Sequence, residues 1–205
     1  MTQAGKSIEH HKKSSFSARH SWTRAILLTG ALLAGHASVS AQTWPQTAPQ
    51  GVDWQLSYGK SNKADVKKVG VIAGWHHGTP LWQGDQWRLA LRHELELAYW
   101  RVPQAQDIVE AGYSPFLRLE RPLGGSGLIF AEASIGVRLL SHVRIADDHT
   151  LSSAFQFSDQ LGAGYQWGAE GRNTVGVRFQ HISNAGIKKP NPGINFTQIY
   201  YRYRF

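Results

Sequence analysis

The sequence predicts an all-β fold, an eight-stranded antiparallel transmembrane β-barrel that follows a cleavable signal peptide. Apolar and polar side chains alternate over several segments with the period of two that is typical of β-strands. Tryptophan and tyrosine lie near the ends of these segments, where the aromatic girdles of a membrane barrel are found. The last of these alternating segments closes on Phe205. After residue 41, no apolar stretch approaches the roughly 20 residues that a membrane helix needs.

Residues 1–41 are expected to be the signal peptide. Basic residues precede an apolar run at 25–34, which is too short to span a bilayer, and residues 39–41 (Val-Ser-Ala) supply a small-residue cleavage site. We therefore divide the chain into a signal peptide, 1–41, and an outer-membrane β-barrel domain, 42–205. About half of the net charge of +8 lies in the leader, so the barrel domain has no nucleic-acid signature. The chain has no cysteine, which excludes disulfides and thiolate metal sites.

Eight segments of the barrel domain show the alternation, and most are near the roughly 9 to 11 residues with which a tilted strand crosses a bilayer. In chain order they are Val52–Tyr58, Lys68–Trp75, Trp87–Trp100, Val109–Glu120, Gly127–Leu140, Ala154–Trp167, Thr174–Asn184 and Thr197–Phe205. In the third segment, six apolar residues share one face with His93, and two arginines and two glutamates share the other. The charged face predicts a packed polar interior, and the apolar face predicts contact with lipid.

A soluble β-sandwich would produce the same alternation, with its apolar face as the core. Two features favour the barrel. The final segment places Ile199, Tyr201, Tyr203 and Phe205 on one face, which resembles the signal by which bacterial outer-membrane proteins are assembled. The aromatic residues at the segment ends match the interfacial girdles that a sandwich does not need.

An even strand number with both termini in the periplasm makes the odd segments run outward, so the connections after segments 1, 3, 5 and 7 face the outside. The first of these, Gly59 to Lys67, carries Lys60, Lys63 and Lys67, with Lys68 beside it. This basic cluster either meets lipopolysaccharide phosphates or is an ordinary solvated loop.

Two polar residues interrupt the apolar face of the seventh segment. Val175, Val177 and Phe179 form this face, and His181 and Ser183 continue it near the outer end of the strand. A polar side chain that points into lipid costs free energy unless it has a partner or a purpose. Neighbouring same-face positions bring a hydroxyl and an imidazole within reach, as a base-activated serine nucleophile requires. The alternative is a pair of polar residues at the interfacial rim.

The residues around this pair resemble a known family. His181-x-Ser183-Asn184-Ala185-Gly186, followed by Pro190-Asn191 and the aromatic final strand, resembles PagL, the outer-membrane lipid A 3-O-deacylases. The resemblance implies a serine esterase without a cofactor that hydrolyses the ester-linked hydroxyacyl chain at the 3-position of lipid A in the outer leaflet. Ser183 would attack the ester carbonyl, and His181 would take its proton. Asn184, Gly186 and Asn191 match the positions that would supply oxyanion donors.

One position departs from the family pattern. The catalytic acid of the family is a glutamate shortly after this loop, and the matching position here is Asn195. An asparagine can orient an imidazole, but it cannot offset the charge of an imidazolium. Either that charge is dispensable or another carboxylate supplies it. Asp159 falls in the apolar series of the sixth segment, and a turn centred near residue 170 would place it opposite His181. Its other possible role is structural, as an acceptor for loop amides or hydroxyls.

Two other functions are open on the sequence. The first is a non-enzymatic barrel for envelope stability or adhesion, and the second is another lipid-modifying barrel, a phospholipase or an acyltransferase. Acyl transfer would need an acyl-binding interior, whereas the interior residues are largely charged. No constellation of metal ligands is evident. The expected partners are lipid A or lipopolysaccharide as substrate, the outer membrane, the barrel assembly machinery through the C-terminal strand, and a second copy in a homodimer.

Overall fold

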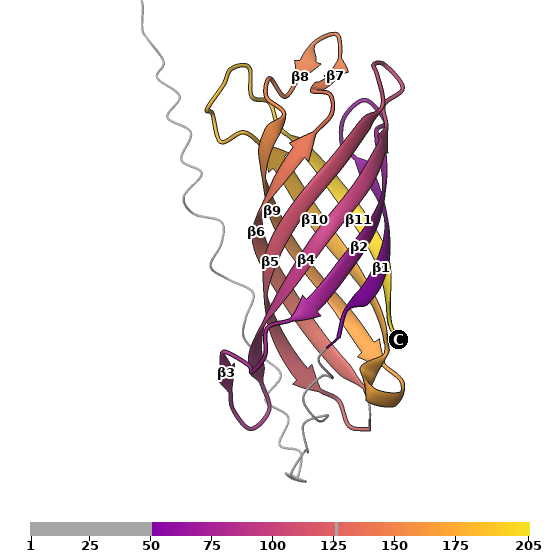
Figure 1. Cartoon of the computed structure of the whole chain (residues 1–205), viewed down its shortest axis with the longest axis vertical. Helices are drawn as coiled ribbons and strands as arrows, with labels where there is room; N and C mark the ends of the chain where they lie inside the picture. Colours follow the sequence, from indigo (N-terminus) through magenta and orange to yellow (C-terminus); the bar gives the residue numbers. More distant parts are fainter. Residues whose placement is uncertain (1–50, 126) are drawn as a thin grey trace, which may run out of the picture. The chain divides into compact units, whose positions relative to one another are not determined.

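Eight long antiparallel strands form a closed barrel in the structure, a computed structural model that describes residues 51–125 and 127–205. The strands are β1 (Asp53–Ser61), β2 (Lys67–His76), β4 (Arg88–Arg101), β5 (Ile108–Pro122), β6 (Leu128–Leu140), β9 (Phe155–Trp167), β10 (Asn173–Ser183) and β11 (Ile194–Arg204). Their order around the wall is β2-β1-β11-β10-β9-β6-β5-β4, and β4 pairs back with β2 to close the ring (Figure 1). The predicted fold class is therefore confirmed. The signal peptide predicted for residues 1–41 lies outside the described residues.

Short elements decorate the two ends of the barrel. β3 (Trp82–Gln83) pairs with β4 in the connection after β2, and η1 (Ala169–Gly171) lies in the turn between β9 and β10. β7 (Arg144–Ala146) and β8 (His149–Thr150) form a hairpin between β6 and β9. We call the end with this hairpin the loop end, at the top of Figure 1, and the opposite end, where β11 finishes, the terminal end. In the described part of the chain, no helix is long and apolar enough to span a membrane.

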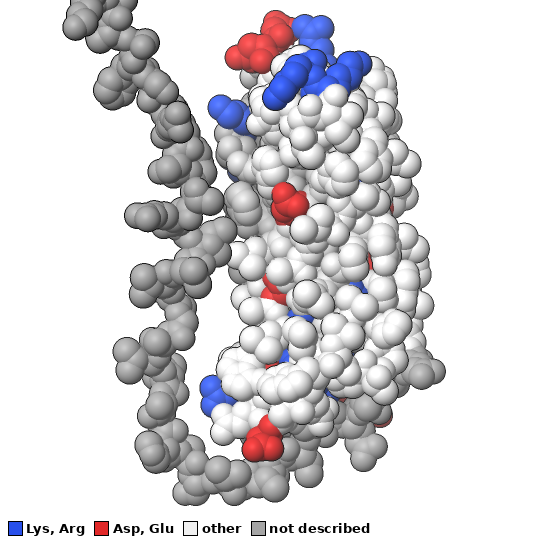
Figure 2. Space-filling model, turned by 90° about the vertical axis from the view of Figure 1, so that its left-hand side faces the viewer, with Lys and Arg blue, Asp and Glu red and all other residues white. Residues whose placement is uncertain are grey.

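The alternation in the sequence corresponds to the two faces of the wall. In β6, every second side chain is buried and the others are exposed, and Ile135 on the outer face is 72% exposed. Leu97 on β4 and Leu161 on β9 are also largely exposed. Figure 2 shows that uncharged residues cover most of the middle of the face it draws, while Lys, Arg, Asp and Glu gather mainly at the top. An apolar belt around a closed barrel is what hydrocarbon requires, because the closed ring pairs every strand edge.

The inner face is polar and filled with ion pairs. Arg178 Nη1 donates to Glu94 Oε2 (2.8 Å) and Arg178 Nε to Glu132 Oε1 (2.8 Å). Lys68 Nζ is fully buried and lies 2.8 Å from Glu110 Oε2. The prediction that Lys68 joins the basic cluster of the first external loop is therefore wrong. β2 begins at Lys67, so the parity of the strand turns the side chain of Lys68 into the barrel, where the carboxylates offset its burial.

An apolar cluster closes the interior at the loop end. Its buried members are Val66, Ala98, Trp100, Val102, Ile108, Leu140, Ile145, Leu151, Ile182, Ile194 and Phe196. The rings of Trp100 and Phe196 meet edge to face, with centroids 4.8 Å apart. Ile182 and Ile194 anchor the outer ends of β10 and β11 in this cluster. The residues on either side of them are thereby held at fixed positions on the outer face.

Candidate active site

The outer end of β10 presents His181 and Ser183 on the lipid-facing surface of the barrel. Both side chains are half-buried, and Ile182 between them is fully buried in the apolar cluster. The expected outward direction of the pair is therefore confirmed. Because a strand alternates its faces, one buried isoleucine fixes the direction of both polar neighbours.

His181 lies between an amide on one neighbouring strand and a carboxylate on the other. In the register of the sheet, its partner on β11 is Asn195 and its partner on β9 is Asp159. His181 Nδ1 and Asn195 Oδ1 are 2.6 Å apart. Asp159 lies on the same outer face and is exposed. The predicted pairing of Asp159 with His181 is confirmed by this register, whereas the sequence analysis started the last strand at Thr197 and so missed that Asn195 belongs to it.

The loop between β10 and β11 is organised by Asn184, whose side chain is fully buried. Its Nδ2 donates to the carbonyl oxygens of Leu151 (3.0 Å) and Lys188 (2.9 Å). Its Oδ1 accepts from the Gly186 amide (3.0 Å), and its own backbone amide donates to Asn191 Oδ1 (3.1 Å). The structure thus brings the three residues predicted as oxyanion donors into one network directly after Ser183.

A glycine and a second histidine, both missed by the sequence analysis, complete the surroundings of His181. A Cβ atom on Gly193 would lie 2.7 Å from His181 Cε1, so the backbone of the loop approaches the imidazole closely. Gly193 also has φ +63, which glycine adopts without strain. His149 Nε2 lies 2.9 Å from the Gly193 carbonyl oxygen, so the β7–β8 hairpin holds this loop in place. The glycine after Pro192 was the only local signal for this contact.

A groove of about 750 Å³ runs across the outer face of the wall from His181 and Asp159. Two rows of outward-facing residues line it, and each row continues from one strand to the next. The upper row is His181, Asp159, Ile135 and Pro115, and the lower row is Phe179, Leu161, Ala133, Leu117 and Leu91. The strands are tilted (Figure 1). The groove lies near the loop end of β10, at His181, and near the terminal end of β4, at Leu91, so it descends along the wall. Apart from His181 and Asp159, its outward-facing lining is apolar.

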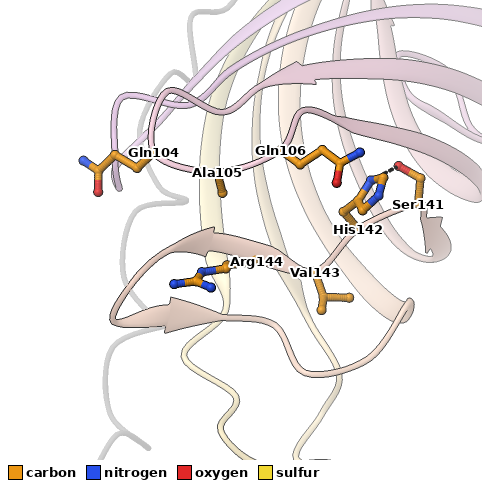
Figure 3. Close-up of a pocket in the computed structure, with 7 residues that line it drawn as sticks. All are labelled: Gln104, Ala105, Gln106, Ser141, His142, Val143 and Arg144. Carbon is orange, nitrogen blue, oxygen red and sulfur yellow. Dashed lines mark hydrogen bonds between the residues drawn. The ribbon is translucent and has the colours of Figure 1, made fainter.

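A second serine–histidine contact lies in a cleft of about 560 Å³ between two connections of the loop end. Ser141 Oγ is 3.1 Å from His142 Nδ1, and Figure 3 shows the pair beside Gln106, with Arg144 across the cleft. Ser141 Oγ also accepts a hydrogen bond from the Val109 amide (2.9 Å). Among the described residues, no side-chain amide or carboxylate is hydrogen-bonded to His142, and the pair lies above the apolar belt. It is therefore the weaker candidate for a nucleophile that acts on lipid.

No group of three or more His, Cys, Asp or Glu in residues 51–125 and 127–205 is arranged to hold a metal ion. The chemistry available at the end of β10 is that of a hydroxyl, an imidazole and the groups that orient the imidazole. Such a set can carry out acyl transfer to a serine hydroxyl and then to water.

Comparisons with known proteins agree with this geometry. The family model described as lipid A 3-O-deacylase (PagL) matches residues 67–204. The lipid A deacylase PagL of Bordetella bronchiseptica is 36% identical over 135 residues, which cover 63% of this chain and 74% of that protein. The lipid A deacylase PagL of Pseudomonas aeruginosa is 31% identical over 178 residues, 86% of this chain and 96% of that protein. The crystal structure of the outer membrane enzyme PagL superimposes with a TM-score of 0.68 at 30% identity, covering 75% of this chain and 99% of that one. The chain belongs to the PagL family of lipid A 3-O-deacylases.

Proposed function

We propose that this protein is a serine esterase that removes the ester-linked hydroxyacyl chain from the 3-position of lipid A in the outer leaflet of the outer membrane. The observation that carries the proposal is the position of His181 and Ser183 on the outer face of β10, where His181 lines one end of an apolar groove. Membership of the lipid A 3-O-deacylase family supports the substrate class. With the loop end outside, the ester of a lipid A molecule in the outer leaflet lies at the depth of this pair.

His181 is the general base in this proposal, and Asn195 selects its tautomer. When Asn195 Oδ1 accepts a hydrogen bond from Nδ1–H, the lone pair of Nε2 is left free to take the proton of the Ser183 hydroxyl. Ser183 Oγ then attacks the ester carbonyl, and the imidazolium returns the proton to the departing sugar oxygen. A water molecule, deprotonated by the same nitrogen, hydrolyses the acyl-enzyme and releases the hydroxy fatty acid.

Asn191 is the first choice for the donor that stabilises the oxyanion formed when Ser183 attacks the ester carbonyl. Its Oδ1 holds the amide of Asn184, the residue after Ser183, which keeps the Asn191 side chain beside the nucleophile. No acceptor in the described part of the chain is bonded to its Nδ2, so this group remains available to the developing negative charge. The Gly186 amide already donates to Asn184 Oδ1, so Asn184 and Gly186 build the loop that positions the donor.

We propose that two residues share the task of the family's catalytic acid. Asn195 orients the imidazole through its amide oxygen but carries no charge. Asp159, in register with His181 on the other side, supplies the negative charge that stabilises the imidazolium. The exposed position of Asp159 on an otherwise apolar face supports this role, because a carboxylate that faces lipid without a task would be costly there.

The groove supports the orientation of the substrate. A chain that is esterified beside Ser183 can follow the gap between the two rows downward, in the direction in which acyl chains extend from a headgroup into a bilayer. The reacting carbonyl is then held at the mouth of the groove, where positioning alone lowers the barrier. The apolar groove would accept a phospholipid chain as well, so the choice of lipid A as the substrate rests on membership of the family.

Reconstitution in vesicles tests this proposal. Purified protein is incubated with lipid A or with phospholipid of matched chain length, and the released fatty acids are identified by mass spectrometry. We expect release of a 3-hydroxy fatty acid from lipid A and little release from phospholipid. Equal release from phospholipid would indicate a phospholipase, and no release from either would indicate a non-enzymatic barrel. Export with removal of residues 1–41, assembly through the terminal strand and formation of a homodimer stay predictions, and the mass of the mature protein checks the first of them.

A further inference from the structure

Four ring-bearing side chains from β2, β4, β5 and the turn after β2 form a cluster on the outer face, far from His181 along the groove. We call Trp75, His77, His93 and Tyr113 the ring cluster. Trp75 and His93 are stacked with centroids 5.4 Å apart, and the centroids of His77 and His93 are 5.7 Å apart. His93 Nδ1 is 2.8 Å from the Tyr113 hydroxyl. Stacking on one side and a hydrogen bond on the other hold the His93 imidazole in a single orientation.

The ring cluster lies where the two rows of the groove reach β4 and β2. His93 is the cross-strand partner of Pro115 and of Trp75, so the upper row continues through His93 to Trp75. The His77 amide donates to the Leu91 carbonyl oxygen (2.9 Å), so the lower row continues from Leu91 to His77. The contact between His77 and His93 therefore crosses from the lower row to the upper row. The gap between the two rows is open from β10 to β4, and the contact between His77 and His93 closes it.

We propose that the ring cluster is the end stop of the acyl groove and sets the longest acyl chain that the enzyme hydrolyses efficiently. This inference rests on the proposed function, in which the scissile chain occupies the groove. From β10 to β4 the groove crosses four strand spacings, a length of roughly 19 Å. A carbon chain built from bonds of about 1.5 Å advances roughly 1.3 Å per carbon, so about 14 carbons fit before the ring of His93 is reached.

The ring cluster discriminates between acyl chains of different length by steric exclusion. Lipid tails are as apolar as the groove, so a longer chain gains little free energy by entering it. A chain with more than about 14 carbons must instead bend away at the ring cluster, and the carbonyl then loses its position beside Ser183. A rigid imidazole suits this task better than a flexible aliphatic side chain, which accounts for polar rings on a face that is otherwise apolar.

The test uses synthetic 3-O-(3-hydroxyacyl)glucosamine 1-phosphates with chains of 10 to 18 carbons in detergent micelles. The quantity compared is kcat/KM for the 18-carbon chain relative to the 12-carbon chain. His77→Ala opens the gap between the rows, and we expect this ratio to rise about tenfold, the lower range for a pocket that discriminates chain length. His93→Ala opens the gap from the upper row. If His77→Ala does not fold, the same rise of the ratio is expected for His93→Ala.

Three variants complete the design. His77→Phe keeps a ring across the gap, so the ratio should stay within about twofold of the wild-type value. Ala133→Leu fills the middle of the groove and should lower cleavage of the 14-carbon chain relative to the 10-carbon chain. Leu97→Ala removes an outward-facing side chain of β4 that does not line the groove, and it should leave the profile unchanged.

The outcomes separate the two proposals. A wild-type enzyme that hydrolyses none of these esters contradicts the proposed function. A wild-type enzyme that is active, with the same chain-length profile in His77→Ala and His93→Ala as in the wild type, contradicts the end stop alone. A rise of the ratio in both opening variants and not in His77→Phe supports it.

Discussion

Replacing Asp159 by asparagine tests whether a carboxylate on β9 takes over the charge that Asn195 cannot provide. The change keeps the size of the side chain and removes its negative charge. Asp159 and His181 are directly opposite each other on β9 and β10, so the carboxylate and the imidazolium are separated by roughly 5 Å. At this distance and an effective dielectric constant of about 20, their attraction is about 3 kcal/mol. Screening at an exposed carboxylate reduces the attraction to roughly 1.5 kcal/mol when water reaches it freely.

A loss of 1.5 to 3 kcal/mol of transition-state stabilisation corresponds to a fall in kcat of roughly 10- to 150-fold. The assay is the steady-state release of 3-hydroxy fatty acid from lipid A in mixed micelles, with kcat and KM determined separately. KM should change little, because the charge is needed only when the imidazole is protonated. Asp148→Asn, which removes an exposed carboxylate from the β7–β8 hairpin, is the matched control and should keep wild-type kcat.

A rescue experiment separates the charge from a structural role. In Asp159→Asn, the further change Asn195→Asp places a carboxylate on the other side of His181, and we expect it to restore at least tenfold of the lost kcat. The reasoning is refuted if Asp159→Asn retains full kcat, or if it loses activity together with thermal stability and the second change restores neither. The first result would mean that the charge is dispensable, and the second that Asp159 holds the fold.

Four further changes give expected outcomes that are distinct from one another. Asn195→Ala removes the acceptor for the His181 imidazole, and the loss of about 1.5 to 3 kcal/mol for a hydrogen bond to a group that becomes charged predicts a fall in kcat of roughly 10- to 150-fold, measured on lipid A. Asn191→Asp keeps the oxygen that holds the loop and removes the amide donor, so kcat should fall by about 10² to 10³ while thermal stability stays within a few degrees of wild type. Gly193→Ala places a methyl group against the imidazole at a positive φ, and activity should fall more than stability, as shown by comparing lipid A hydrolysis with heat-dependent gel mobility. Glu94→Ala removes one carboxylate partner from each of the buried residues Arg178 and Arg202, and urea unfolding in detergent should show a destabilisation of about 3 to 5 kcal/mol.

The barrel could be predicted because each of its strands alternates apolar residues on one face with polar residues on the other. Lipid requires apolar side chains on every second position, and the interior requires partners for its charges, so the alternation is visible without any knowledge of the contacts. The direction of His181 and Ser183 followed from the same parity. The register of Asp159 also followed, because the turn between β9 and β10 is short and fixes the pairing.

Other features depend on contacts that no local pattern encodes. Pro192-Gly193 is a turn signal, but the pairing of β11 with β10 decides that the strand begins at Ile194 and includes Asn195. Lys68 was already placed at the start of the second strand, but its inward direction and its ion pair with Glu110 depend on the assembled wall. The ring cluster unites residues of three strands and the turn after β2, and the closing of the groove at this cluster becomes visible only when the wall is assembled.

In the proposed mechanism, Ser183 at the outer end of β10 is the nucleophile that removes a hydroxyacyl chain from lipid A. The most direct measurement is the mass spectrum of lipid A from Gram-negative cells that express the wild-type protein, Ser183→Ala or Ser141→Ala at equal levels of folded barrel. We expect lipid A that lacks one 3-hydroxyacyl chain with the wild type and with Ser141→Ala, and unchanged lipid A with Ser183→Ala. Loss of the same chain in cells that express Ser183→Ala would contradict this mechanism.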